Sequence, residues 1–258
     1  MGDTRELAEG YTLANDTQYN AGLFLLSRLD IQPGMHVLDV GCGPGNLTAY
    51  IARLVGDGGR VVGIDPSEER LAIAKSLPDR QLSFFQGKAE DLSRFESGSF
   101  DVVFVNSTLH WVQDQPRAMR EFARVLRPGG QLGISGGSGD FVAIHERIKA
   151  DVLGREPFSA YQEVEPPRFL KRAELEGLLE AAGFRERTIV VNNIVKKARD
   201  ADDMIDWLDT SSSGKTYGGI PLELRPRARE LMKREWEPFV TDEGIKMDME
   251  LLVTVAVR

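Results

Sequence analysis

Residues 37–45 read VLDVGCGPG, and this stretch is the strongest structural signal in the sequence. An apolar strand runs into a glycine-rich turn, and the apolar residues from Leu47 to Val55 then recur at the spacing of one helix face. Glycines permit positive φ angles and let a ligand come close to the backbone, while the start of a helix offers free N–H groups. The stretch therefore predicts a strand–turn–helix unit with a polar ligand in its turn.

Strand-like and helix-like segments alternate through the rest of the first half. Strands are predicted at Arg60–Asp65, Leu82–Gln86, Phe100–Val105 and Gln131–Ser135, with helices from Ser67 and over 118–126. This alternation is typical of an α/β fold whose parallel sheet is covered on both faces. The second half is predicted to contain a helix over 175–182 capped by Gly183, a strand near 188–195, helices between 200 and 240 with a loop at 211–214, and a last strand over 251–257.

Composition excludes several classes of function. The 258 residues include 32 Lys and Arg against 40 Asp and Glu, a net charge of −8, so neither nucleic acid nor a membrane surface is an expected partner. The single cysteine, Cys42, excludes an internal disulfide, and the three histidines show no metal-ligand spacing, so no metal is expected. Since no apolar run approaches the roughly 20 residues that span a bilayer, a cytoplasmic protein is predicted.

The glycine spacing indicates which ligand the turn holds. A dinucleotide fingerprint requires glycine at 41, 43 and 46, but position 46 is Asn46 and the third glycine is Gly45. Asp39 lies just ahead of the turn, where it would repel a pyrophosphate and attract a cationic amine. The pattern favours a nucleoside joined to an amino acid over NAD, so an NAD-dependent oxidoreductase is disfavoured.

Two further carboxylates follow the next strands. Asp65 ends the second strand, where it can accept hydrogen bonds from ribose hydroxyls, and Asp91 follows the third strand, where it can accept from an adenine amine. Each also has a structural interpretation, since Asp65 precedes Pro66-Ser67 and can cap a helix, and Asp91 can cap a turn. Three acids at consecutive strand ends favour a ligand site.

Five motifs together resemble the class I S-adenosylmethionine-dependent methyltransferases. They are VLDVGCGPG (37–45), GID (63–65), AED (89–91), FDVVFVNSTLHW (100–111) and RVLRPGG (124–130). The resemblance implies a Rossmann-like, doubly wound, seven-stranded sheet whose last strand is antiparallel. The Leu109-His110-Trp111 element, Tyr11, Tyr19 and the C-terminal helical insertions are similar to the trans-aconitate methyltransferase branch and its small-molecule carboxyl-methylating relatives.

The same resemblance implies the site residues. Asp39 and the backbone around Gly41 would hold the methionine moiety, and Asp65 the ribose. The adenine would lie against Ala89 to Asp91. The residues assigned to the cofactor are Asp39, Gly41, Cys42, Gly43, Gly45, Asp65, Pro66, Ala89, Glu90, Asp91, Asn106 and Tyr19.

Fewer residues are candidates for binding the methyl acceptor. His110 is the candidate catalytic residue, to orient or deprotonate the acceptor, and Trp111 and Tyr11 are candidates for contacting it. Alternatively, His110 only packs in its loop and the tyrosines are core aromatics. His36, expected to be buried at a strand start, and His145, on an insertion helix, are predicted to be structural.

One domain over 1–258 is predicted. It would comprise an N-terminal helical cover (1–30), a cofactor-binding half (31–136) and a substrate-side half (137–258) whose helical insertions, near 140–170 and 196–249, form a lid. The predicted function is transfer of the methyl group of S-adenosylmethionine to a small-molecule acceptor, releasing S-adenosylhomocysteine. The alternative is a cofactor-binding protein of the same fold that transfers no methyl group. The sequence does not determine whether the protein is a monomer or a dimer.

Overall fold

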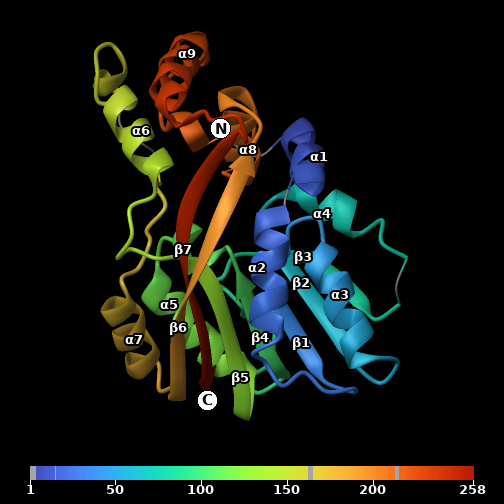
Figure 1. Cartoon of the computed structure of the whole chain (residues 1–258). Helices are drawn as coiled ribbons and strands as arrows, with labels where there is room; N and C mark the ends of the chain where they lie inside the picture. Colours follow the sequence, from blue (N-terminus) through green and yellow to red (C-terminus); the bar gives the residue numbers. More distant parts are fainter. Residues whose placement is uncertain (1–3, 15, 79, 162–164, 213–214) are drawn as a thin grey trace. The chain divides into compact units, whose positions relative to one another are not determined.

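A computed structural model describes residues 4–14, 16–78, 80–161, 165–212 and 215–258 (Figure 1). These residues form two compact units. The sheet unit comprises the described residues within 16–140, 167–192 and 251–258, and the helical unit those within 1–15, 141–166 and 193–250. Ser213 and Gly214 of the predicted 211–214 loop lie outside the described residues.

A seven-stranded sheet runs in the order β3-β2-β1-β4-β5-β7-β6. Strands β1 to β5 pair in parallel and β7 pairs antiparallel with β5, so the predicted Rossmann-like sheet with an antiparallel last strand is confirmed. Its strands are β1 (His36–Val40), β2 (Arg60–Asp65), β3 (Leu82–Gln86), β4 (Phe100–Asn106), β5 (Leu126–Gly137), β6 (Arg185–Ala198) and β7 (Ile245–Val257).

Helices flank this sheet on both faces. Figure 1 shows α2 and α3 in front of the sheet, while residues of α5 and α7 share an apolar cluster with Leu132 and Ile134 of β5. Ser67 caps α4 by accepting the backbone N–H of Arg70, as predicted. The helices of the sheet unit are α2 (Asp16–Leu26), α3 (Asn46–Val55), α4 (Glu68–Ala74), η1 (Leu109–Trp111), α5 (Gln115–Val125) and α7 (Arg172–Ala181).

Three strands are longer than predicted. β5 begins at Leu126 rather than Gln131, because Leu126 already pairs with Phe100 before the register shifts and Val102 pairs with Gln131. β6 and β7 also start earlier, at Arg185 and Ile245. The early part of β6 is Arg185-Glu186-Arg187, and polar residues alternate with apolar ones at the start of β7, so neither extension is a continuous apolar run that would mark it as a strand.

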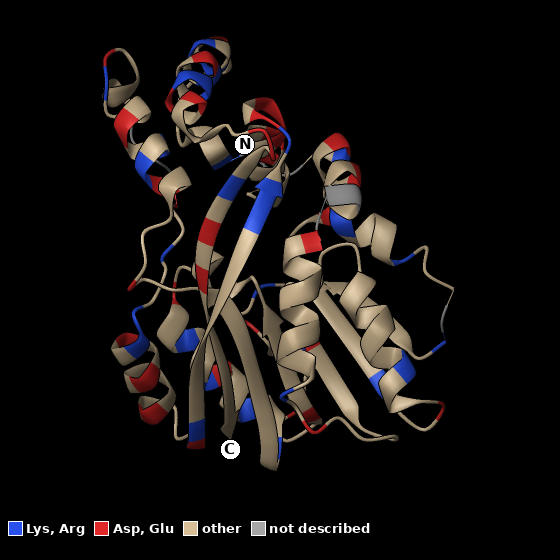
Figure 2. Cartoon of the chain, in the orientation of Figure 1, with Lys and Arg blue, Asp and Glu red and all other residues tan. Residues whose placement is uncertain are grey.

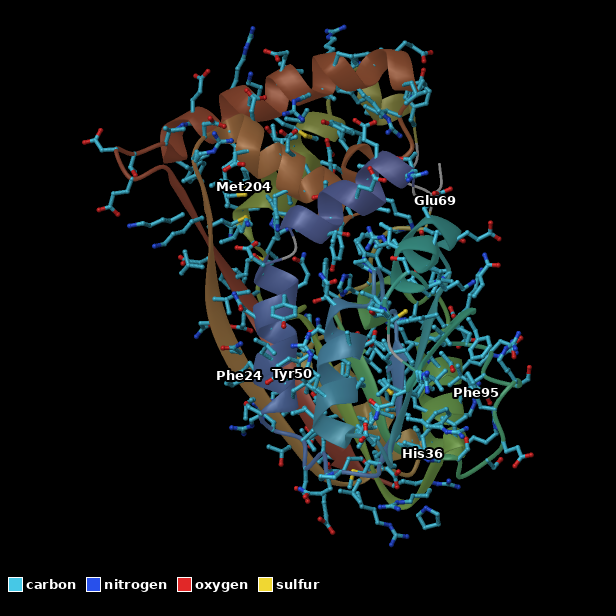
Figure 3. The ribbon with its side chains drawn as sticks, turned by 90° about the vertical axis from the view of Figure 1, so that its right-hand side faces the viewer. Phe24, His36, Tyr50, Glu69, Phe95 and Met204 are labelled. Atoms are coloured by element: carbon cyan, nitrogen blue, oxygen red, sulfur yellow. The ribbon has the colours of Figure 1, made fainter. Side chains whose placement is uncertain are left out.

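The helical unit has an apolar core of its own. Trp236 is 1% exposed and Met204 (Figure 3) is fully buried within it. Charges of both signs are intermixed on α9 (Figure 2), where Arg229 lies 2.9 Å from both Asp202 and Asp206 of α8. Its helices are α1 (Arg5–Ala14), α6 (Ile144–Leu153), η2 (Phe158–Ala160), α8 (Ala201–Ser211), η3 (Lys215–Tyr217), η4 (Leu222–Leu224), α9 (Arg225–Trp236) and η5 (Glu237–Phe239). None of the described helices combines the length and apolarity needed to cross a membrane.

Two histidines lie outside the candidate site. His36 is exposed at the start of β1 (Figure 3), so the prediction that it is buried is wrong: burial of this strand begins at Val37. His145 lies on α6, as predicted, with Nε2 3.1 Å from Oε1 of Glu146.

Candidate functional site

The glycine-rich turn joins β1 to α3 through three residues with positive φ angles, Gly41 (75°), Gly43 (53°) and Gly45 (87°). The backbone N–H groups of Gly41 and Cys42 donate to the carbonyl of Ile64, at 2.8 and 3.0 Å, and so tie the turn to β2. A Cβ on Gly41 would overlap the side chain of Thr108. The loop after β4 therefore packs directly against the turn.

Asp39 is buried beneath this turn, with 2% of its surface exposed. Thr48, in the first turns of α3, donates a 2.6 Å hydrogen bond to Oδ2 of Asp39. Burial raises the pKa of Asp39 to about 7, opposed by the Thr48 bond and assisted by the negative charge of Asp65. A positively charged group beside this carboxyl would favour its ionised form.

Asp65 connects the turn to the end of β2. Its Oδ2 accepts the N–H of Gly43 at 2.9 Å, and its Oδ1 accepts the N–H of Ser67 at 2.8 Å across Pro66. The capping interpretation and the ligand interpretation are compatible, because a carboxylate has about four acceptor positions. The neighbouring thiol of Cys42 has a pKa well above its usual range, because of burial and the charges of the two acids.

The loop after β3 carries the residues predicted to contact adenine. Ala89 is 5% exposed, and Oε1 of Glu90 accepts the N–H of Gln113 at 3.1 Å. Asp91 Oδ1 accepts the N–H of Ser93 at 3.1 Å. Its pKa is lowered, first by this partner and then by arginines of α5, so Asp91 remains an ionised acceptor.

Asn106 ends β4 and faces α2. Its Nδ2 donates to the carbonyl of Gln18 at 2.9 Å, while Oδ1 of Asn106 and Oε1 of Gln18 are buried and accept no hydrogen bond from the described residues. Tyr19, the next residue of α2, is half-buried. The following Ser107 has a left-handed φ of 52°, which turns the chain toward η1.

The loop after β4 presents an aromatic group. The ring of His110 stacks on Phe169 with centroids 4.8 Å apart and planes at 27°, and it lies 5.1 Å from the ring of Trp111. The backbone N–H of Arg168 donates to the carbonyl of His110 at 2.7 Å. These contacts attach η1 to the segment before α7.

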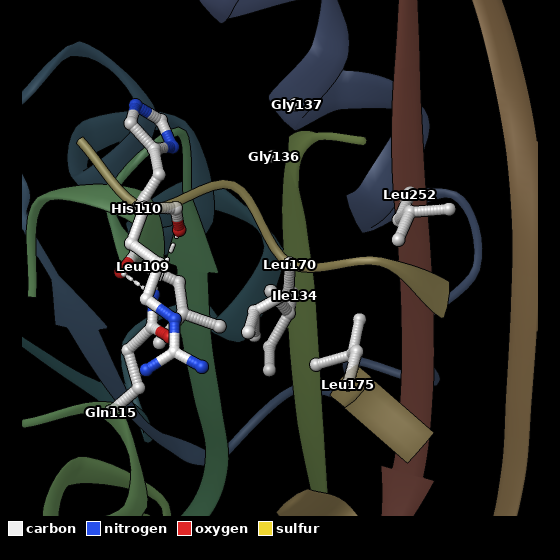
Figure 4. A pocket seen from close by; sticks show the side chains of 10 residues that line it. Leu109, His110, Gln115, Ile134, Gly136, Gly137, Leu170, Leu175 and Leu252 are labelled. Atoms are coloured by element: carbon white, nitrogen blue, oxygen red, sulfur yellow. Dashed lines mark hydrogen bonds between the residues drawn. The ribbon is translucent and has the colours of Figure 1, made fainter. Parts of the chain in front are cut away.

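A small cavity lies beneath this group (Figure 4). The fully buried Gln115 lines it and donates to the carbonyls of Leu109 and Arg168, at 3.0 Å each. Apolar side chains form most of its other walls, and the imidazole of His110 points away from them (Figure 4). At about 20 Å³ the cavity has room for a single water molecule, so it cannot hold an acceptor.

The structure brings most of the predicted residues into the sheet unit. Asp39, Asp65 and the glycine turn meet at the carboxyl ends of β1 and β2, and Asn106 ends the neighbouring strand β4. Tyr11 belongs to α1 of the helical unit, so its role stays a prediction.

Sequence reasoning missed several contributors. Thr48 has a local signal, since a hydroxyl in the first turns of the helix can reach back to a strand acid. Gln18 and Phe169 have none, because only tertiary packing brings them beside Asn106 and His110.

The side chains at this site fit S-adenosylmethionine better than they fit a metal ion. The carboxyl groups of Asp39 and Asp65 and the unmatched acceptors of Gln18 and Asn106 all suit a ligand rich in N–H and O–H donors. Across the described part of the chain, no three His, Cys, Asp or Glu side chains are grouped to hold a metal ion.

Comparison with known proteins agrees with this geometry. The family described as "Methyltransferase domain" matches residues 38–134. The chain is 32% identical over 219 residues to an uncharacterised methyltransferase of Schizosaccharomyces pombe, covering 79% of this chain and 81% of that protein. It is 31% identical over 210 residues to nocamycin O-methyltransferase of Saccharothrix syringae, covering 71% of each. The crystal structure of YcgJ from Bacillus subtilis, 16% identical, shares the fold with a TM-score of 0.67 over 93% of this chain and 98% of that one.

Proposed function

The chain belongs to the class I S-adenosylmethionine-dependent methyltransferases, and we propose that it methylates a small, flat organic acceptor beside His110. When bound, S-adenosylmethionine supplies an electrophilic methyl group and leaves as S-adenosylhomocysteine. The observation that carries the proposal is the packing of Thr108 against Gly41, because it joins the His110 loop to the turn that would hold the donor. Donor and acceptor would then be close enough for in-line transfer.

On the donor side, each residue has one role. Asp39 attracts the ammonium of the methionine moiety, and the unmatched acceptors of Gln18 and Asn106 take its N–H donors. Asp65, at the carboxyl end of β2, accepts hydrogen bonds from the ribose hydroxyls. Residues 89–91 recognise the adenine.

On the acceptor side, the rings of His110, Trp111 and Phe169 favour a flat acceptor. Arg168 lines the cavity, and its side chain is 60% exposed and lies 3.9 Å from Glu174, so a carboxylate on the acceptor would compete with Glu174 for it. A carboxylate, with a pKa of about 4, is already ionised at neutral pH and needs no base, whereas a phenol needs one. The narrower resemblance, to the trans-aconitate methyltransferases and their carboxyl-methylating relatives, remains a prediction.

The lid predicted from the sequence, the helical insertions near 140–170 and 196–249, remains part of the proposal. As a lid it would exclude water and limit the shape of the acceptor.

Transfer from labelled S-adenosylmethionine tests the proposal. The full chain is incubated with panels of flat aromatic acids, phenols, aliphatic di- and tricarboxylates, amines and thiols, and labelled product is separated. Label in a flat acid or phenol supports the proposal, and label confined to aliphatic acids, amines or thiols contradicts the acceptor class. Tight binding of S-adenosylhomocysteine without any transfer favours the alternative, a cofactor-binding protein that does not methylate.

A further inference from the structure

Arg124 opens the motif RVLRPGG, and the proposed function gives this residue no role. It lies near the end of α5, where its guanidinium forms a two-pronged ion pair with Glu121: Nε is 2.8 Å from Oε1, and Nη2 is 2.8 Å from Oε2. Both side chains are partly buried, with 31% and 20% of their surfaces exposed. The pair is thus shielded from full solvent screening.

The same two side chains also form hydrogen bonds with the segment that follows residues 89–91. Arg124 donates to the carbonyls of Leu92 and Phe95, at 2.8 Å each, and Glu121 accepts the N–H of Leu92 at 2.9 Å. Phe95 (Figure 3) is further held by its edge-on contact with Phe100 of β4, with ring centroids 5.3 Å apart. The backbone of residues 92–95 is therefore fixed to α5, and the side chain of Phe95 is held against β4.

We propose that Glu121 and Arg124 are positioning residues that hold residues 89–91 in the conformation that recognises adenine, and so set the preference for an adenosyl ligand. The inference rests on the proposed function. Residues 89–91 lie between β3, which fixes them on one side, and the segment 92–95, which the pair fixes on the other. Glu90 adds a third attachment through the N–H of Gln113.

Electrostatics within the cluster agree with this role. The Arg124 partner lowers the pKa of Glu121, so both members stay ionised at neutral pH. Arg124 also contributes to the lowered pKa of Asp91, and an ionised Asp91 is the form that accepts a hydrogen bond from an amine.

The test compares two ligands that differ at the base. Calorimetry measures binding of S-adenosylhomocysteine and of S-inosylhomocysteine, which lacks the exocyclic amine, to wild type, Arg124→Lys, Glu121→Gln and Arg120→Gln. Lysine keeps the charge but cannot replace the fork of donors. Arg120 is an exposed arginine of the same helix and serves as the matched control.

Wild type is expected to prefer the adenosyl ligand by about tenfold or more, since a site built for an N–H donor rejects a ligand without it. Arg124→Lys and Glu121→Gln are expected to lose about tenfold in affinity for the adenosyl ligand and most of the preference, while Arg120→Gln keeps both within about twofold. A purely stabilising ion pair would leave the preference between the two ligands unchanged.

Other outcomes of the binding measurements overturn either the inference or the proposed function. A folded Arg124→Lys protein with wild-type preference overturns the inference, as does a wild type that binds both ligands equally. If Arg124→Lys is unfolded at the assay temperature, Glu121→Gln decides, because the side-chain carbonyl of the glutamine can still accept the N–H of Leu92. If wild type binds neither ligand, the proposed function itself is overturned, and the positioning role falls with it.

Discussion

The backbone N–H of Gly43 donates a 2.9 Å hydrogen bond to Oδ2 of Asp65, which joins the glycine-rich turn after β1 to the end of β2. The other carboxylate oxygen accepts the N–H of Ser67 at 2.8 Å, at the start of α4. Asp65 therefore holds two loops in place through its own hydrogen bonds. Its substitution must affect both the stability of the protein and its affinity for ligand.

Asp65→Ala is expected to weaken binding of S-adenosylhomocysteine about 10- to 150-fold, because charge-assisted hydrogen bonds contribute roughly 1.5 to 3 kcal/mol. Calorimetry measures this affinity, and Asp57→Ala, at an exposed loop position, is the control. The melting temperature of Asp65→Ala should also fall, since two backbone N–H groups lose their acceptor. Unchanged affinity in a folded variant would remove Asp65 from the site.

Stability should depend on pH through Asp39. Because its pKa is raised from 3.8 to about 7 in the folded protein, the folded chain binds a proton that the unfolded chain has released between these values. The contribution is fully present below the unfolded pKa and is lost as pH rises through 7. The free energy of unfolding should therefore fall across this window by up to about 1.4 kcal/mol per pH unit.

Chemical denaturation at several pH values tests this slope. Asp39→Asn should remove it, and Thr48→Val should shift its upper end to higher pH, because the Thr48 bond lowers the pKa of Asp39. The affinity for S-adenosylhomocysteine, which carries an ammonium, should rise with pH over the same range in wild type and not in Asp39→Asn. An identical slope in wild type and Asp39→Asn would contradict the assignment.

His110 should matter for some acceptors and not for others. His110→Gln is expected to reduce turnover of a phenol about 100-fold or more, since a positioned base contributes at least that factor. Turnover of an acceptor carboxylate should stay within about threefold, because that group is already ionised. Steady-state rates measured on both acceptor types test this prediction, and His145→Gln is the control. If neither rate changes by more than about threefold, His110 neither acts as base nor orients the acceptor.

Alanine substitutions at Gly41 and Gly34 distinguish the cost of backbone strain from the cost of close packing. Both have positive φ angles, 75° and 89°, but a Cβ on Gly41 would overlap Thr108, whereas one on Gly34 would meet nothing within 4 Å. Gly41→Ala should therefore lower the unfolding free energy by more than Gly34→Ala, which is expected to cost about 1 kcal/mol. Thr108→Ala should partly restore Gly41→Ala. Equal losses in the two alanine variants would show that the packing of Thr108 is unimportant.

The parallel half of the sheet follows from local sequence. Alternating apolar strands and helical faces locate β1 to β4 and α3 to within a residue or two, and Ser67 marks the start of α4 as its cap. The start of β5 does not follow, because the pairing of Leu126 with Phe100 depends on a register shift that no local pattern encodes. The burial of His36 was predicted wrongly, since the first residue of a strand can still face solvent.

Local sequence was enough to locate the glycine turn, the acids of β1 and β2 and the positions of the first four strands along the chain, because backbone conformation and hydrophobic periodicity are set by residues close together in the chain. The partners of the site residues depend on tertiary packing: Thr48 bonds Asp39, Gln18 bonds Asn106 and Phe169 stacks on His110. The hydrogen bonds of Glu121 and Arg124 with Leu92, directly after residues 89–91, likewise depend on tertiary packing. Such contacts join residues far apart in sequence, and packing selects them from many partners of similar local propensity.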